Sequence, residues 1–572
     1  MTVKTFLLGT VASLLIGTQV QPVAAESAAG AYLAGRNAAI NSDYAEAARY
    51  YGDALARDPA NVELIESTVL ALLSLGDLEK AAPLARQLEE QDESSQVARM
   101  VITADLAKQG DFAALIDRSP DTSGIGPWVD GLVKAWAQVG AGNVSSAMEA
   151  FDALSEEAGM QSFVQYHKAL ALASVGDYEG AEAIFAQSMA GAAGQTRRGV
   201  IAHAEILAQL DRHEDALEVL RANFGEATDP ELDQLIARLE AGEPISYAHV
   251  KDAQAGIAEV FFTFAAVLKS EAAGDYYVLL YTRIARYLRP DHIDALLLNA
   301  GLLESLGQFD LAIREYKDVP ADNPAFHVAE LGRADALYRS DRKAQAIEVL
   351  EHLTRTHGDL AVVHSTLGDI LRKEGNYAEA ITAYDKAIDL APETAPVRWV
   401  LFYSRGIAHE RSDNDAAMEA DFRAALELNP EQPQVLNYLG YSMVEQQRNL
   451  DEALDMIERA VAASPDSGYI VDSLGWVLYR LGRFDEAVDH MERAVELLAV
   501  DPVVNDHLGD VYWAVGRHRE AEFQWSRALS FIDDEDDQSE ADPERIRRKL
   551  EVGLDKVLEE EGAPPLKIAN DI

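Results

Sequence analysis

The chain has 572 residues, and its 49 Lys and Arg against 97 Asp and Glu give a formal net charge of −48. A surface this acidic excludes nucleic acid as a main partner, because phosphate binding needs a basic face that releases counterions. Anionic lipid headgroups are repelled for the same reason. The absence of cysteine excludes disulfides, thiolate metal sites and cysteine nucleophiles. Hydrophobic residues make up 48% of the sequence, so we expect a folded chain rather than an acidic disordered one.

The first 25 residues have the layout of a secretory signal peptide. Lys4 is the only charge before Glu26, an apolar run extends from Phe6 to Gly17, and small residues precede a cleavage point after Ala25. The apolar run is too short to span a bilayer, and an uncleaved anchor is the alternative to a cleaved signal. No later segment is apolar enough to form a transmembrane helix. Without a cysteine at the cut there is no lipid-attachment site. We therefore expect a periplasmic protein that is not a lipoprotein and has no direct membrane anchor.

A 34-residue pattern recurs along the chain. In its clearest unit, which starts at Ala361, glycine stands at positions 8 and 15, alanine at position 20, a large aromatic residue at position 24 and proline at position 32. Small residues at 8 and 20 let two antiparallel helices approach closely, and the glycine at 15 supplies a positive φ between them. Proline ends the second helix. This is the tetratricopeptide repeat pattern, and it predicts an all-α solenoid, a right-handed superhelix of about fourteen helical hairpins.

The same frame extends over most of the sequence. Predicted units begin near Ala28, Val62, Gln96, Trp128, Ser162, Arg197, Ile293, His327, Ala361, Trp399, Pro433, Gly468 and Pro502. The turn glycine recurs as Gly76, Gly110, Gly142, Gly176, Gly307, Gly375, Gly482 and Gly516. The alanine of position 20 recurs as Ala47, Ala81, Ala147, Ala181, Ala216, Ala312, Ala346, Ala380, Ala453, Ala487 and Ala521.

Two breaks divide the predicted solenoid. The repeat lapses at about 229–251 and resumes in an apolar stretch, 257–268, that predicts a long buried helix. The second break is the acidic run 533–537, followed by an amphipathic helix at about 543–561 that would cap the solenoid. We therefore expect a signal peptide (1–25), an N-terminal superhelix (26–228), an irregular joint (229–258), a C-terminal superhelix (259–535), and an acidic loop with a capping helix and tail (536–572).

No motif indicates catalysis. The sequence has no H-E-x-x-H pair, no G-x-S-x-G elbow, no phosphate-binding loop and no dinucleotide fingerprint. The acidic run 533–537 lacks the alternating ligands and the glycine of an EF-hand loop, so a solvated loop is favoured over a calcium site. We expect a non-enzymatic protein with no catalytic residue, metal or cofactor. A pair of carboxylates that converge across the superhelix is the alternative.

The inner face of the last repeats carries the candidate binding residues. In each unit, positions 2, 5, 9 and 12 of the first helix point into the groove, and four of the six tryptophans lie between 399 and 525. Aromatic rings beside Asn, Asp and Arg are typical of peptide-binding hot spots. The alternative is that the final helix folds back and buries these rings. The candidate groove residues are Asn437, Tyr441, Tyr469, Asp472, Trp476, Tyr479, Arg480, Asp506, Asp510 and Trp513.

The motifs in 437–441, 472–482 and 507–513 resemble those of the large envelope tetratricopeptide proteins of Gram-negative bacteria. That family includes a lipoprotein adaptor that binds and activates a carboxyl-terminal processing protease and presents cell-wall hydrolases to it. The close resemblance covers roughly 360–530 and implies a scaffold role with protein partners. The lipid-bearing cysteine of the adaptor is absent here, so outer-membrane anchoring does not carry over.

These observations predict a protein-binding scaffold or adaptor of the cell envelope. The C-terminal groove would hold one partner and the N-terminal half a second client, on either side of the joint. An alternative is an assembly factor for export of an envelope polymer, which would have to be neutral or cationic because the scaffold is acidic. An enzyme whose site carries no recognisable motif is the third possibility.

Overall fold

The computed structural model describes residues 28–566, with gaps at 92–94, 119–123, 157–158, 160, 189–195, 226–228 and 533–540. Every regular element in these residues is an α-helix, which confirms the predicted all-α class. The predicted signal peptide (1–25) and acidic run (533–537) lie outside the described residues. Within the described part of the chain, no helix is long and apolar enough to cross a membrane.

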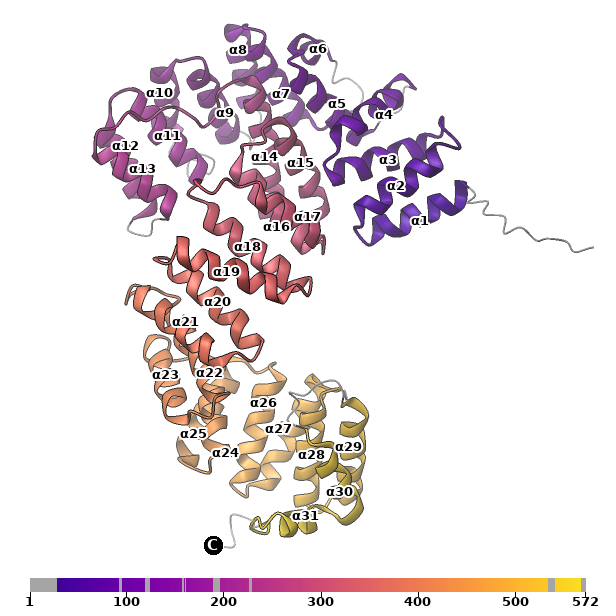
Figure 1. Cartoon of the computed structure of the whole chain (residues 1–572), viewed down its shortest axis with the longest axis vertical. Coiled ribbons are helices and arrows are strands. Elements are labelled where there is room, and N and C mark those ends of the chain that lie inside the picture. The colour runs from indigo at the N-terminus through magenta and orange to yellow at the C-terminus, as the bar shows by residue number, and fades with distance from the viewer. Residues whose placement is uncertain are drawn as a thin grey trace, which may run out of the picture. The chain divides into compact units, whose positions relative to one another are not determined.

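The chain divides into two compact units, Met1–Arg342 and Lys343–Ile572. The division therefore falls between Arg342 and Lys343, whereas the joint expected at 229–258 lies inside unit 1 and contains helix α13. The helices of unit 1 (Figure 1) are α1 (Ala28–Ile40), α2 (Tyr44–Leu55), α3 (Val62–Leu75), α4 (Leu78–Glu90), α5 (Gln96–Gln109), α6 (Phe112–Asp117), α7 (Pro127–Gly140), α8 (Val144–Ser155), α9 (Gln161–Ser174), α10 (Tyr178–Ser188), α11 (Arg197–Gln209), α12 (His213–Phe224), α13 (Pro230–Glu240), α14 (Ala253–Ser270), α15 (Asp275–Leu288), α16 (Ile293–Ser305), α17 (Phe309–Lys317) and α18 (Phe326–Arg339).

Unit 2 continues the hairpins and ends in two short helices. Its helices are α19 (Lys343–Thr356), α20 (Ala361–Lys373), α21 (Tyr377–Leu390), α22 (Arg398–Glu410), α23 (Asp415–Leu428), α24 (Pro433–Glu445), α25 (Leu450–Ala463), α26 (Gly468–Arg480), α27 (Phe484–Leu497), α28 (Pro502–Ala514), α29 (His518–Phe531), α30 (Pro543–Val552) and α31 (Leu554–Glu560).

The repeat frame is confirmed. Each first helix begins within one residue of the predicted start of its unit. The predicted turn glycines all have positive φ, as Gly76 (90°) and Gly516 (81°) illustrate. The alanines predicted at position 20 are all fully buried where the two helices of a hairpin cross. Small residues at the crossing and left-handed glycines at the turn therefore build these hairpins as the sequence predicts.

An apolar hairpin of the same chain fills the inner face of unit 1. Helix α14 packs against α5, α7 and α9, and α15 packs against α3 and α5, so both contact the first helices that line the inner face (Figure 1). A Cβ at Gly256 would lie 2.2 Å from the fully buried ring of Trp136, so glycine is needed for α14 to approach α7 this closely. Helices α14 and α15 therefore occupy the inner face of α3, α5, α7 and α9, and binding of a second client by the N-terminal half stays a prediction.

A buried polar cluster ties α14 to the helices around it. Glu259 is fully buried and accepts hydrogen bonds from Arg198 of α11 (2.7 and 2.9 Å) and from the Tyr166 hydroxyl of α9 (2.8 Å). Nε2 of His292 lies 3.2 Å from the same carboxylate. Burial alone would raise the pKa of Glu259, but Arg198 and His292 hold it well below its ordinary value. The buried charge is therefore compensated only when α14 is seated against α9 and α11.

Two helices cap unit 2, where the sequence predicted one helix at 543–561. Gly553, with φ of 82°, separates α30 from α31. A Cβ at this position would lie 2.5 Å from the ring of Trp513, so the break lets the tryptophan pack under the chain. Helix α30 packs against α29 and sends Lys549 to α28. The Lys549 side chain is fully buried, and its Nζ lies 2.9 Å from both carboxylate oxygens of Asp506 and 2.7 Å from Oδ1 of Asp510.

We expect unit 1 to lose stability in mild acid, and His203 to account for part of that loss. The buried His203 ring stacks on Phe185 with centroids 5.0 Å apart, and neither ring nitrogen has a hydrogen-bond partner among the described residues. Burial lowers the pKa of His203 to about 4. Because the unfolded ring binds a proton below about pH 6.5 and the folded ring does not, His203 should lower the free energy of unfolding by about 2 kcal/mol between pH 7 and pH 5.

His203→Phe should remove this pH dependence and should stabilise the protein at pH 7 by about 1 kcal/mol, because it replaces an unpaired buried polar ring. Urea unfolding of the full chain, followed by circular dichroism at both pH values, measures the effect. His352→Gln, at an exposed position of α19, is the control and should lose as much stability as the parent. An equal acid loss in His203→Phe and the parent would contradict the assignment.

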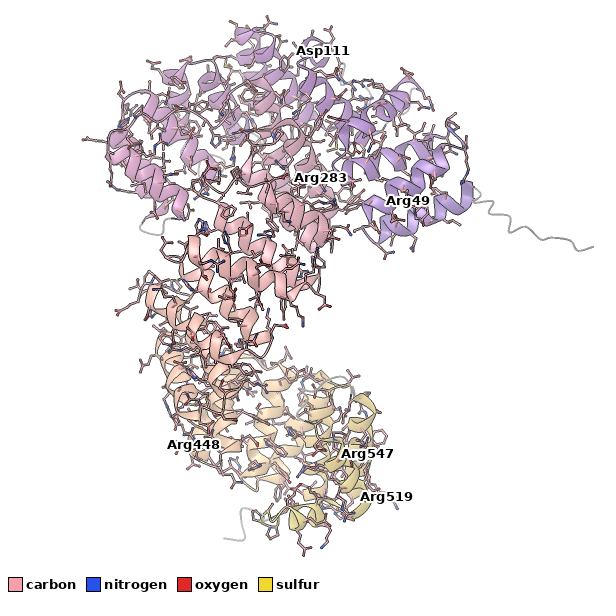
Figure 2. All side chains as sticks on the ribbon, in the orientation of Figure 1. Arg49, Asp111, Arg283, Arg448, Arg519 and Arg547 are labelled. Atoms are coloured by element: carbon pink, nitrogen blue, oxygen red, sulfur yellow. The ribbon has the colours of Figure 1, made fainter. Side chains whose placement is uncertain are left out.

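Lys549→Met should release the cap. Removing one partner of a buried ion pair costs about 3 kcal/mol or more, because Asp506 and Asp510 would remain buried without their cation. Hydrogen exchange of the full chain should therefore speed up in α30 and α31 while α26 and α27 stay protected. Arg547→Met on the same helix (Figure 2), whose cation is exposed and pairs with the neighbouring Glu544, should exchange like the parent. Unchanged protection of α30 in Lys549→Met would show that this ion pair does not hold the cap.

Candidate partner-binding cleft of unit 2

A cleft of about 470 Å³ opens among the repeats of unit 2. Helices α22, α24, α26 and α28 all contribute to its walls, together with the start of α23. Because these four are the first helices of successive hairpins, the cleft lies on the inner face of the unit. It is lined by Glu410, Asp415, Met418, Tyr441, Ser442, Glu445, Gln446, Trp476 and His507.

One wall of the cleft is a stack of three rings. Trp476 lies between Tyr479, at 4.9 Å between ring centroids, and His507, at 4.0 Å, with interplanar angles of 14° and 13°. Its indole Nε1 donates a hydrogen bond to Oε1 of Glu445 (2.8 Å). Trp476 is only 9% exposed, so the expectation of an open hot-spot ring is corrected. The ring is a fixed wall rather than a free contact surface.

A buried ion pair fixes the third ring of the stack. Asp472 of α26 is buried, and its Oδ2 lies 3.0 Å from Nδ1 of His507 on α28. Burial alone would lower the pKa of His507, but the adjacent Asp472 carboxylate raises it above the ordinary value. His507 therefore holds its proton to a higher pH than a free histidine does. The pair bridges two consecutive repeats and holds the histidine face against Trp476.

Three of the predicted groove residues face the cap instead of an open groove. The Lys549 ammonium group binds the carboxylates of Asp506 and Asp510. Burial raises the pKa of the Asp506 carboxyl above its ordinary value. Trp513 stacks on His518 at 4.1 Å between centroids and donates to Oδ2 of Asp555 on α31 (3.1 Å). The folded-back alternative therefore holds at this end of unit 2. The structure brings Tyr441, Asp472, Trp476 and Tyr479 together at or beside the cleft.

The remaining predicted residues lie in different surroundings. Asn437 stands one turn before Tyr441 on α24, and its Oδ1 is buried with no hydrogen-bond partner among the described residues. Nη1 of Arg480 lies 4.0 Å from Oε1 of Glu445. Tyr469 is 60% exposed and does not line the cleft.

The acidic side chains of the cleft were not predicted as site residues. Glu410, Asp415 and Glu445 place three carboxylates on its walls, with Arg480 as the neighbouring cation. Glu445 follows Tyr441 by one helical turn, so its helical spacing could have identified it. Asp415 lies on the second helix of its hairpin, where the inner-face rule does not apply. No group of side chains in the described residues is suited to hold a metal ion.

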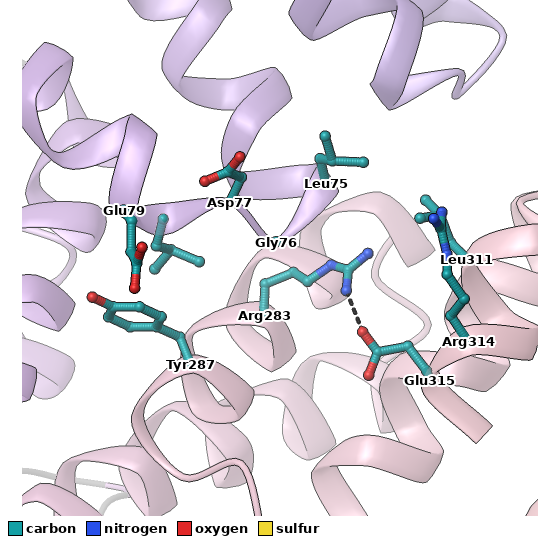
Figure 3. A pocket seen from close by; sticks show the side chains of 10 residues that line it. Leu75, Gly76, Asp77, Glu79, Arg283, Tyr287, Leu311, Arg314 and Glu315 are labelled. Carbon is teal, nitrogen blue, oxygen red and sulfur yellow. Dashed lines mark hydrogen bonds and ion pairs between the residues drawn. The ribbon is translucent and has the colours of Figure 1, made fainter. Parts of the chain in front are cut away.

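A second cavity, of about 480 Å³, lies in unit 1 around Arg283 (Figure 3). Arg283 is 5% exposed; its Nε donates to the Ser74 carbonyl (2.9 Å) and its Nη1 to Oε1 of Glu315 (2.6 Å). These bonds join the end of α3 to α15 and α17, so Arg283 has a structural role in unit 1. Asp77 and Glu79 line the same cavity, so its charge is mixed. The unit 2 cleft is therefore the stronger candidate for partner binding.

Comparisons with known proteins agree with the repeat frame. The tetratricopeptide repeat family matches residues 32–96, 361–394, 405–468 and 444–502. TPR repeat-containing protein PA4667 of Pseudomonas aeruginosa is 28% identical over 193 residues, which are 33% of this chain and 32% of the relative. Protein O-mannosyl-transferase TMTC1 of Homo sapiens is 27% identical over 175 residues, which are 30% of this chain and 20% of that protein. The matches thus span a third or less of either relative.

Solved structures resemble the chain at low sequence identity. The crystal structure of the APC/C hetero-tetramer Cut9–Hcn1 is 15% identical, with a TM-score of 0.38 over 93% of this chain and 97% of the other. Yeast Tom70 is 16% identical, with a TM-score of 0.34 over 93% of this chain and 96% of its own. The family matches fall on hairpins whose helix starts, turn glycines and buried alanines follow the repeat. Residues 32–96, 361–394 and 405–502 therefore form tetratricopeptide repeats, and the fold of the described chain is a solenoid of such hairpins.

Proposed function

We propose that this protein is a non-enzymatic scaffold of the cell envelope that binds partner proteins through the cleft of unit 2. The observation that carries the proposal is the cleft itself. It is the part of the inner face where α22, α24 and α26 converge and no other described segment of the chain fills the space. By contrast, α14 and α15 cover the inner face of α3, α5, α7 and α9 in unit 1, and α30 places Lys549 on the inner face of α28 in unit 2.

The walls of the cleft favour binding because they are already rigid. Trp476 is held on both faces by Tyr479 and His507 and at its edge by Glu445. A preformed wall loses little conformational entropy when a partner docks, and that loss is a main cost of association. Tyr441 adds a half-buried aromatic side chain at the opening. Aromatic residues of this kind supply most of the binding energy at protein interfaces.

We further propose that the partners are a carboxyl-terminal processing protease and its cell-wall hydrolase substrates. The support is the resemblance of 437–441, 472–482 and 507–513 to the envelope adaptor, since these segments build the stacked wall and the helix beneath the cap. A scaffold that holds protease and substrate together raises their effective concentration without taking part in the chemistry. This role needs no catalytic residue of the scaffold itself.

Tyr441→Ala should weaken partner binding by at least about 1 kcal/mol, because it removes an aromatic contact at the cleft opening. Trp476→Ala is less informative, since truncating a buried tryptophan also destabilises the fold by about 3 kcal/mol or more. The measurement is quantitative co-purification of the full-length protein with envelope extract, followed by titration of each recovered partner. A protease or cell-wall hydrolase should be recovered with the parent and lost with Tyr441→Ala.

Tyr277→Ala is the matched control, because Tyr277 is 65% exposed on α15 of unit 1 and does not line the cleft. The Tyr277→Ala variant should co-purify with the same partners as the parent. Equal recovery of the same partners by the parent and Tyr441→Ala, with unchanged dissociation constants, would contradict the assignment of binding to the cleft. Recovery of polymer-export components in place of a protease or hydrolase would contradict the adaptor role.

The envelope location predicts a specific N-terminus. When the full chain is produced in a Gram-negative host, the protein in the periplasmic fraction should begin at Glu26, because the signal peptide is cut after Ala25. Mass spectrometry of the intact protein measures this directly. A chain that keeps residues 1–25 and fractionates with the cytoplasm would contradict the proposed location.

A further inference from the structure

We propose that the unit 2 cleft receives the side chain of a lysine or arginine from an exposed segment of the partner protein. This inference rests on the proposed function and adds the chemistry of the contact. It follows from a comparison of equivalent inner-face positions in three consecutive repeats. Positions 5 and 9 of the first helix are Asn437 and Tyr441 in α24, Asp472 and Trp476 in α26, and Asp506 and Asp510 in α28.

In two of these repeats, the inner-face carboxylates already hold a cationic group from the chain itself. At α28, Lys549 places Nζ within 2.9 Å of both Asp506 oxygens and 2.7 Å from Asp510, beside the ring of Trp525 at 5.7 Å from its centroid. At α26, Asp472 pairs with His507, whose pKa is raised by that carboxylate. In both repeats, therefore, inner-face carboxylates bind a cationic group beside an aromatic ring.

The cleft has the same components, and the cationic group on its wall, His507, is already paired with Asp472. Glu445, whose carboxylate already accepts a hydrogen bond from the Trp476 indole, and Asp415 contribute carboxylates, while Tyr441 contributes an aromatic ring. The exposed Asp415 carboxylate has no ion-pair partner in the described part of the chain. Arg480 approaches Glu445 from beside the cleft, at 4.0 Å, and does not line it. Carboxylates beside aromatic rings favour a cation both by charge and by the negative faces of the rings.

The space suits a side chain from another protein. At about 470 Å³, the cleft has room for a long side chain and part of its backbone. Near it, the buried Oδ1 of Asn437 lacks a donor among the described residues, one turn from Tyr441. A cationic side chain brings several N–H donors and a flexible apolar stem, which matches carboxylates set against aromatic rings. An acidic side chain would meet like charge, and a purely apolar one would leave the Asp415 carboxylate without an ionic partner.

The test selects peptides from a positional-scanning library with the immobilised full-length protein, in parallel with three variants. One is Asp415→Asn/Glu445→Gln, which removes two cleft charges while the new amide oxygen at 445 still accepts the Trp476 hydrogen bond. The second is Asp489→Asn/Glu458→Gln, a matched control that changes two exposed carboxylates on α27 and α25. The third is Tyr441→Ala, which reports whether a peptide binds in the cleft at all.

We expect the parent and the matched control to select Arg or Lys at one fixed position. The affinity of the selected peptide should fall at least about tenfold in Asp415→Asn/Glu445→Gln, because charge-assisted hydrogen bonds are lost. Raised ionic strength should weaken binding to the parent more than to that variant. Replacing the selected residue by Gln in the peptide should reproduce the loss with the parent protein.

Two results would overturn the inference, and they are distinguishable. Peptides that lose affinity for Tyr441→Ala, but carry no cation preference and bind the Asp415→Asn/Glu445→Gln variant unchanged, would refute the cationic contact and leave the proposed function standing. Peptides that bind the parent and Tyr441→Ala equally, or no selected peptide at all, would refute peptide binding in the cleft and the proposed function with it.

Discussion

The inner face of a helical-hairpin solenoid must be covered or put to use, because the first helices present side chains there that the hairpins do not bury. In unit 1, α14 and α15 cover this face, with Trp136 packed against Gly256 and Glu259 bound to Arg198. At the end of unit 2, α30 and α31 cover it, with Lys549 bound to Asp506 and Asp510. Within unit 2, the cleft beside Trp476 stays open. The location of the candidate site is therefore a consequence of where the chain covers itself.

Both covers are held by a buried charge of the inserted segment that meets opposite charge on the inner face. Such pairs contribute little net stability compared with apolar side chains of similar size, but an unpaired partner is costly. They therefore favour one register of the inserted helix over others. Glu259 finds Arg198 and Tyr166 only when α14 lies across α9 and α11, and Lys549 finds both aspartates only when α30 lies on α28. Apolar burial supplies the attraction in each case, and the ion pair selects the position.

Local sequence patterns predict most of the fold. The features that the sequence does not predict depend on contacts between residues that are distant in sequence. Turn glycines such as Gly76 and buried alanines such as Ala380 act within one hairpin, so the sequence alone predicts them. The apolar stretch 257–268 predicts the buried helix α14, but the location of this helix on the inner face of unit 1 depends on contacts with α5, α7 and α9, which are distant in sequence. The break at Gly553 was missed for the same reason, since it is the ring of Trp513 that requires it.

The candidate site shows the same limit at the level of single residues. Trp476 lines the cleft, but the sequence does not show that its ring is covered, because the covering residue, His507, comes from the next repeat and is held there by Asp472. The sequence does not identify Glu445 as a site residue, although its carboxylate accepts a hydrogen bond from Trp476. Carboxylates are too frequent in this chain for a single one to be distinguished. In a chain this acidic, the composition does not show which carboxylates line a cleft. Only the structure separates those that meet a cation or an aromatic ring from those that are merely solvated, and at this inner face that distinction defines the cleft.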